Sequence, residues 1–114
     1  PERVAENAAK VLRLAREASE EAYPGRSCKY VLMAPLKATE DVLKGDFAEG
    51  FDDELVAMTE AAPEAFRRQA EKDGFLFFDA NMHAVCGKKD GVHLDAENHR
   101  KLGEAMAEWI KSII

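Results

Sequence analysis

The sequence predicts an α/β fold with a parallel sheet. Segments with helical periodicity alternate with short, unbroken apolar runs in the order helix, strand, helix, strand, helix, an order typical of strands joined by crossover helices. The two apolar runs show no polar alternation, which indicates strands covered on both faces. The chain has 114 residues, 46% of them hydrophobic, which suits one small domain with its own core.

The first helix is predicted over residues 2–22. Pro24 and Gly25 end it, since neither residue continues a helix easily. The apolar face that we expect to pack on the sheet repeats at spacings of three and four and consists of Val4, Ala8, Val11, Leu12, Ala15, Ala18 and Ala22.

The first strand is predicted over residues 30–34, with the sequence YVLMA, and Pro35 stops it. Residues 36–50 are polar, contain Gly45 and Gly50, and are predicted to form a loop.

A second helix is predicted from Phe51 to Gly74. Pro63 lies inside it and is expected to interrupt or restart it, because proline suits a first turn but not a helix interior. The second strand follows over residues 75–79, with the sequence FLFFD.

Residues 80–94 are predicted to be a loop, and Asp95 to be the N-cap of the last helix, with Glu97 in its first turn. That helix is expected to bury Leu102, Met106, Trp109, Ile110 and Ile113. Two strands are too few, because each strand of a covered parallel sheet needs neighbours. We therefore expect part of a larger sheet, or a unit that borrows strands from a partner.

The composition argues against several functional classes. The net charge of −6 and the pI of about 5.1 disfavour nucleic-acid binding, which needs a basic surface. The longest apolar runs fall far short of the roughly 20 residues of a membrane span. The first ten residues are charged and unlike a signal peptide. Two cysteines, Cys28 and Cys86, make no disulfide framework, so a cytoplasmic location is the simplest expectation.

Asp90 and His93 are the candidate catalytic residues. In open parallel sheets, functional groups gather at the carboxyl ends of the strands, where Asp79 ends the second predicted strand and the loop with Asp90 and His93 follows. The spacing Asp-x-x-His in a turn can bring the carboxylate to one imidazole nitrogen. The other nitrogen is then free to take a proton from a hydroxyl group.

Three segments resemble the SGNH hydrolases, also called GDSL-type esterases and lipases. DGVHLDAENHRKLGEAMAEWI is similar to their final block of Asp-x-x-His and terminal helix. CKYVLMAPL and AFRRQAEKDGFLFFDAN resemble the two preceding strands of arylesterase-like members. The resemblance covers nearly all 114 residues. It implies that residues 1–114 are the C-terminal half of one three-layer, flavodoxin-like α/β/α domain.

The same resemblance implies a serine esterase that needs no cofactor or metal and acts on small acyl or aryl esters or acetylated sugars. His93 matches its general base and Asp90 the residue that orients the base. The family's Gly-Asp-Ser and Gly-x-Asn-Asp motifs are absent, and Ser19, Ser27 and Ser112 lie in neither. We therefore expect the isolated chain to be inactive. Its expected partners are a small ester substrate and the missing N-terminal half or a second copy.

Three alternatives remain open at this stage. A metal could be bound by residues that cluster in the sequence, namely His83, Cys86, Asp90, His93 and His99. Cys86 could act as a nucleophile with His93 as its base. The chain could also be a non-catalytic α/β interaction module or an inactive remnant, because the bare order of elements permits either.

Overall fold

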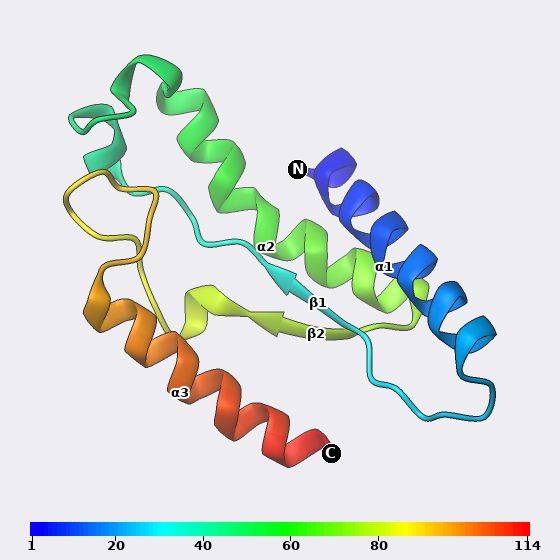
Figure 1. The fold of residues 1–114 in the computed structure, drawn as a ribbon. Coiled ribbons are helices and arrows are strands. Elements are labelled where there is room, and N and C mark those ends of the chain that lie inside the picture. The colour runs from blue at the N-terminus through cyan, green and yellow to red at the C-terminus, as the bar shows by residue number, and fades with distance from the viewer.

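A computed structural model describes all residues, 1–114, and confirms the predicted order of elements (Figure 1). The helices and strands are α1 (Glu2–Ala22), β1 (Val31–Ala34), α2 (Asp53–Asp73), β2 (Leu76–Asp79) and α3 (Ala96–Ile113). Three short 3-10 turns occupy the loops, at Glu40–Leu43, Ala48–Gly50 and Ala80–Met82. No helix is both long and apolar enough to cross a membrane. The cytoplasmic location stays a prediction.

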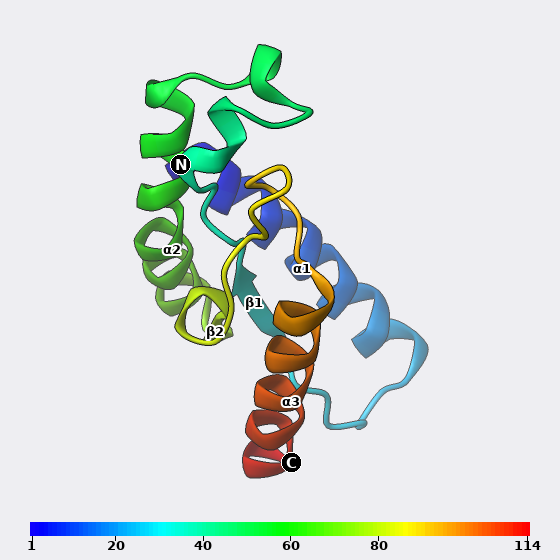
Figure 2. The same cartoon turned by 90° about the vertical axis from the view of Figure 1, so that its left-hand side faces the viewer.

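The sheet consists of β1 and β2, paired in parallel with Leu32 opposite Phe77 and Met33 opposite Phe78. Successive side chains of a strand point to opposite faces. Leu32 and Phe77 therefore pack towards α1 and α2, while Phe78 contacts Trp109 of α3, with 5.1 Å between the ring centroids. Helices thus lie on both sides of the sheet, with α3 alone on its side (Figures 1 and 2). The predicted α/β class is confirmed.

The main core lies between α1, α2 and the sheet. Small residues dominate the helix surfaces there, which lets the helices approach the strands closely. Its nine buried residues are Ala5, Ala9, Leu32, Ala34, Ala62, Ala65, Phe66, Ala70 and Phe75. At one end of the core, Arg13 of α1 donates to Asp73 of α2 at 2.6 Å.

The expected interruption of α2 at Pro63 is wrong. The helix runs unbroken from Asp53 to Asp73, although proline cannot donate a backbone hydrogen bond. Burial of Ala62, Ala65 and Phe66 around this position accounts for its tolerance, because tertiary packing offsets the lost bond. The predicted end at Gly74 is confirmed, with φ +73° in the left-handed region that glycine favours.

The prediction that the strands are covered on both faces is also only partly correct. Met33 is 42% exposed and Leu76 37% exposed. In α3, Ile110 is exposed, and Asn98 is the only buried residue. The physical reason is that α3 is the only helix that covers this face of the sheet (Figures 1 and 2).

The predicted apolar face of α1 is only partly correct. Of the predicted residues, Ala8 and Leu12 pack against the core, whereas Val4 and Val11 remain 56% and 68% exposed. The buried residues of α1 are Ala5 and Ala9, which lie outside the predicted set. The radius of gyration is 15.9 Å, against about 13 Å for a compact domain of this length. The helices and strands are therefore arranged less compactly than in a typical domain of this length.

Candidate active site

Two loops meet at the carboxyl end of the strands, residues 36–50 after β1 and residues 80–95 after β2 (Figures 1 and 2). The Thr39 N–H donates to the Gly91 carbonyl at 2.9 Å. Gly91 has φ +70°, and a Cβ there would lie 2.3 Å from the Val42 nitrogen. A Cβ on Gly45 would lie 2.8 Å from the Asp90 Cα. Glycine is therefore required on both sides of this contact.

Asp90 and His93 are brought together as predicted. Oδ2 of Asp90 lies 2.8 Å from Nδ1 of His93. Oδ1 of Asp90 accepts the backbone N–H groups of Val92 and His93, both at 2.9 Å. The turn that Gly91 permits therefore satisfies both oxygens of the carboxylate within three residues.

These hydrogen bonds keep Asp90 ionised and thereby decide which nitrogen of a neutral His93 carries the proton. The backbone N–H of His93, the backbone N–H of Val92 and the His93 side chain hold the pKa of Asp90 at about 2, below its ordinary 3.8. An ionised carboxylate only accepts, so Nδ1 of His93 must be the donor. The neutral ring then carries its lone pair on Nε2, as a general base requires.

His93 faces an open, mostly apolar depression. Its side chain is 67% exposed, whereas that of Asp90 is 15% exposed, and Nε2 of His93 makes no hydrogen bond. The depression has a volume of about 530 Å³ and reaches from β1 to α3. Its lining consists of Met33, Ala34, Pro35, Leu36, Ala80, Val92, His93, Leu94, His99 and Leu102.

The fold of the chain is similar to that of solved esterase structures. A protein provisionally assigned as an arylesterase from Agrobacterium tumefaciens is 29% identical, with a TM-score of 0.70 over 94% of this chain and 50% of its own. The carbohydrate acetylesterase Est24 from Sinorhizobium meliloti is 21% identical, with a TM-score of 0.72 over 97% of this chain and 49% of its own. No family model and no curated protein sequence matches the chain.

The resemblance to SGNH-type esterases is confirmed. The chain spans about half the length of the solved structures it matches, and it has the fold of that half. The small parallel sheet is therefore part of an esterase-type α/β fold.

The thiol and hydroxyl groups of the chain are not hydrogen-bonded to the His93 side chain. Cys86 is buried, and its single S–H can donate either to the carbonyl of Val92 at 3.1 Å or to that of Lys37 at 3.3 Å. Burial, and then the charge of Asp90, raise the pKa of the Cys86 thiol, which lowers the fraction of reactive thiolate. No serine hydroxyl is hydrogen-bonded to His93, and that of Ser112 donates to the Trp109 carbonyl in its own helix.

The five residues of the metal alternative do not converge. No group of three or more His, Cys, Asp or Glu side chains is placed to hold a metal ion. His83 instead stacks on Phe78, with ring centroids 5.2 Å apart. Asp79, which ends β2, accepts from the backbone and side-chain nitrogens of Asn81 at 2.9 Å.

Sequence reasoning missed the residues that hold the site together. Asn81 accepts from the Lys37 N–H at 2.8 Å and donates to the Pro35 carbonyl at 2.9 Å, so it ties the ends of the two strands. Phe47 lies beside His93, with ring centroids 5.4 Å apart. The sequence offers one signal of the contact between the loops, Gly91 between Asp90 and His93, because a glycine within a turn can mark a close backbone approach.

Proposed function

We propose that residues 1–114 form the C-terminal half of an SGNH-type ester hydrolase and carry the base end of its Ser-His-Asp triad. The observation that carries this proposal is the 2.8 Å contact from Asp90 to Nδ1 of His93, with Nε2 free at the carboxyl end of the sheet. A carboxylate that orients a histidine in this way is the base half of a serine hydrolase. The esterase-type structures with this fold support the reaction class.

In the proposed reaction, Nε2 of His93 takes the proton of a serine hydroxyl while the serine oxygen bonds to the ester carbonyl carbon. Nε2 then gives that proton to the alcohol oxygen, the ester C–O bond breaks, and an acyl-serine remains. Water loses a proton to Nε2 and attacks the acyl group, and the proton returns to the serine oxygen as the acid leaves. Asp90 stays ionised and stabilises the imidazolium in both steps.

The nucleophile would come from the half of the domain that is not in this chain. A further parallel strand beside β1 would have its carboxyl end at the same edge of the sheet as the loop of His93. The apolar depression that extends from Met33 to His93 supports this placement, because an added strand would cover it. Oxyanion donors would lie on the same added elements.

The surface of the chain supports such a partner. Val4, Val11 and Leu14 of α1 are each more than half exposed, and Met33 of β1 is 42% exposed. A two-stranded sheet also leaves hydrogen-bonding groups unpaired at its edges. A second copy of the chain could cover the same surface. The match to half of each solved structure favours the missing half as the physiological partner.

The proposed substrates are small esters. The names of the two similar proteins, carbohydrate acetylesterase and arylesterase, suggest acetylated sugars or aryl esters. The choice between them would depend largely on loops of the other half.

A chimaera tests the proposal. Residues 1–114 replace the matching half of the Agrobacterium protein, and hydrolysis of p-nitrophenyl acetate is measured. We expect turnover by the chimaera and none by the 114-residue chain. His93→Ala should lower kcat on the order of 10⁴-fold or more.

His99→Ala is the matched control, because His99 borders the same depression and has no assigned role. It should keep most of the activity. Turnover that survives His93→Ala would reject the role of His93. Turnover by the 114-residue chain that is lost in His93→Ala would show that the chain contains its own nucleophile.

A further inference from the structure

We propose that Phe47 is a positioning residue for the imidazole of His93. The two rings lie 5.4 Å apart between centroids, at an interplanar angle of 53°. Phe47 comes from the loop after β1, whereas Asp90 and His93 lie on the loop after β2. The base would therefore be oriented from two separate loops. Its catalytic meaning rests on the proposed esterase function, but the contact itself does not.

The imidazole needs a second contact. Asp90 bonds only Nδ1, and the His93 side chain is 67% exposed. A single hydrogen bond leaves the rest of a solvated ring free to tilt or to exchange partners with water. A tilted aromatic neighbour at this distance favours one ring orientation, because the edge of one ring is attracted to the face of the other.

The loop that carries Phe47 is packed against Asp90, the residue proposed to orient the base. Gly45, two positions earlier, packs against the Asp90 backbone so closely that a Cβ would lie 2.8 Å from the Asp90 Cα. The Ala48 N–H donates to the Gly45 carbonyl at 3.2 Å, and the Gly50 N–H donates to the Phe47 carbonyl at 3.0 Å. Phe47 thus sits between two hydrogen-bonded turns with Gly45 as their anchor.

Core packing does not account for the place of Phe47. It is 46% exposed, and it lies outside the small core cluster of Ala38, Val42 and Val56 in this part of the molecule. Phe51, four residues later, does pack against that cluster. A half-exposed phenylalanine next to the base is consistent with a role at the base.

Nuclear magnetic resonance of the folded 114-residue chain, alone or within the chimaera, tests this inference. In the unaltered chain we expect nuclear Overhauser effects between the Phe47 ring protons and the imidazole protons of His93. Long-range ¹H–¹⁵N spectra at about pH 8.5, where an ordinary imidazole is neutral, give the ratio of the Nδ1–H to the Nε2–H tautomer. Phe47→Leu should lower this ratio about two- to tenfold, and Phe47→Tyr should preserve it.

Phe51→Leu is the matched control, because it loosens the same loop without touching His93. It should leave the tautomer ratio unchanged. Absence of the Overhauser effects, an unchanged ratio in Phe47→Leu, or an equal change in Phe51→Leu would each overturn the proposal. If Phe47→Leu does not fold, the Overhauser effects and Phe47→Tyr decide. None of these readouts needs ester turnover, so they fail or succeed independently of the esterase proposal.

Discussion

The helical body and the site loops are stabilised by different forces. The body of α1, α2 and the sheet is held by apolar burial around nine core residues. The loops 36–50 and 80–95 have only a small apolar cluster of Ala38, Val42 and Val56, and they are held in addition by backbone hydrogen bonds, two close glycine contacts and the Asp90 carboxylate. The body leaves large apolar side chains exposed, whereas no buried side-chain nitrogen or oxygen in the chain lacks a partner.

This difference teaches which part of the chain depends on its surroundings. A hydrophobic core is non-local, and its stabilisation grows with the apolar area that neighbouring layers cover. A hydrogen-bonded turn such as Asp90–His93 is formed within a few residues of the chain. The Asp90–His93 turn can therefore form although apolar side chains of the body around it stay exposed.

The largest expected effect concerns the body. Phe66→Ala removes a core side chain that is 5% exposed and should lower the free energy of unfolding by about 3–5 kcal/mol, measured by urea titration. Val11→Ala, on the outer face of α1, should change it by less than about 0.5 kcal/mol. Similar losses for both variants would mean that the outer face of α1 is covered.

A smaller effect is expected in the site loops. Gly74→Ala, at the end of α2, is the control. It places a Cβ at φ +73° with no atom within 4 Å, so only the strained backbone conformation lowers the free energy of unfolding, by about 1–2 kcal/mol. Gly91→Ala has the same backbone strain, and its Cβ also lies 2.3 Å from the Val42 nitrogen. Gly91→Ala should therefore lower the free energy of unfolding, measured by urea titration, by more than Gly74→Ala does. It should also loosen the Asp90–His93 turn. Equal losses for the two variants would contradict the close contact between the loops.

Acid should weaken the loops in a defined range. Asp90 has a pKa of about 2 in the folded chain against an ordinary 3.8. Its stabilising contribution is therefore complete above about pH 5 and disappears as the pH falls from about 4 towards 2. The stability difference between the unaltered chain and Asp90→Asn, from urea titrations along this range, should shrink accordingly. A constant difference down to pH 2.5 would exclude this carboxylate as the source.

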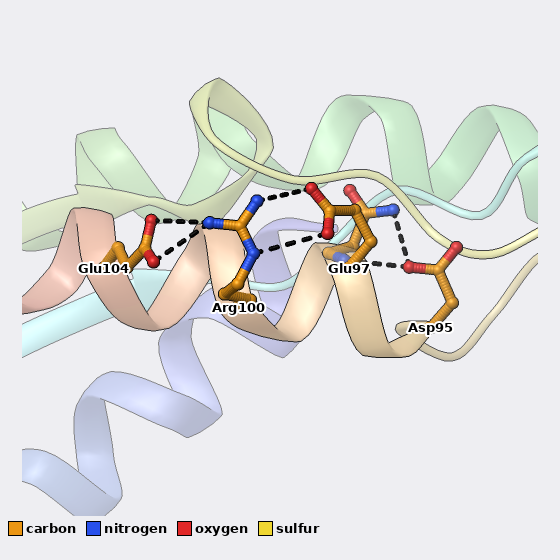
Figure 3. A network of polar contacts seen from close by, with 5 residues as sticks. Asp95, Glu97, Arg100 and Glu104 are labelled. Atoms are coloured by element: carbon orange, nitrogen blue, oxygen red, sulfur yellow. Dashed lines mark hydrogen bonds and ion pairs between the residues drawn. The ribbon is translucent and has the colours of Figure 1, made fainter.

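The smallest effect is expected on the surface of α3. Arg100 bridges Glu97 and Glu104 in the network of Figure 3. All three side chains are more than half exposed, and exposed pairs contribute little because water and salt screen them. Arg100→Ala should leave urea unfolding unchanged within error. Asp95→Ala should lower the free energy of unfolding measurably, because Asp95 caps the helix by accepting from the Asn98 N–H at 2.8 Å.

Local patterns predicted most of the elements. Periodicity and the punctuation by Pro24, Gly25 and Pro35 located the first helix and strand to within one residue. Asp95 and Gly74 marked helix ends because capping is a property of a few neighbouring residues. Pro63 misled the prediction, since only the packing of α2 on the sheet shows why the helix tolerates it.

The sequence alone determined the α/β order, the esterase resemblance and the pairing of Asp90 with His93, because each depends on residues close together in the chain. Only the tertiary structure revealed which faces stay exposed, how Gly45 and Gly91 allow the two loops to pack closely, and that Phe47 lies beside His93. The loops that meet there are about 45 residues apart in the chain. Contacts over such a separation arise from the packing of the whole chain, which no local pattern encodes.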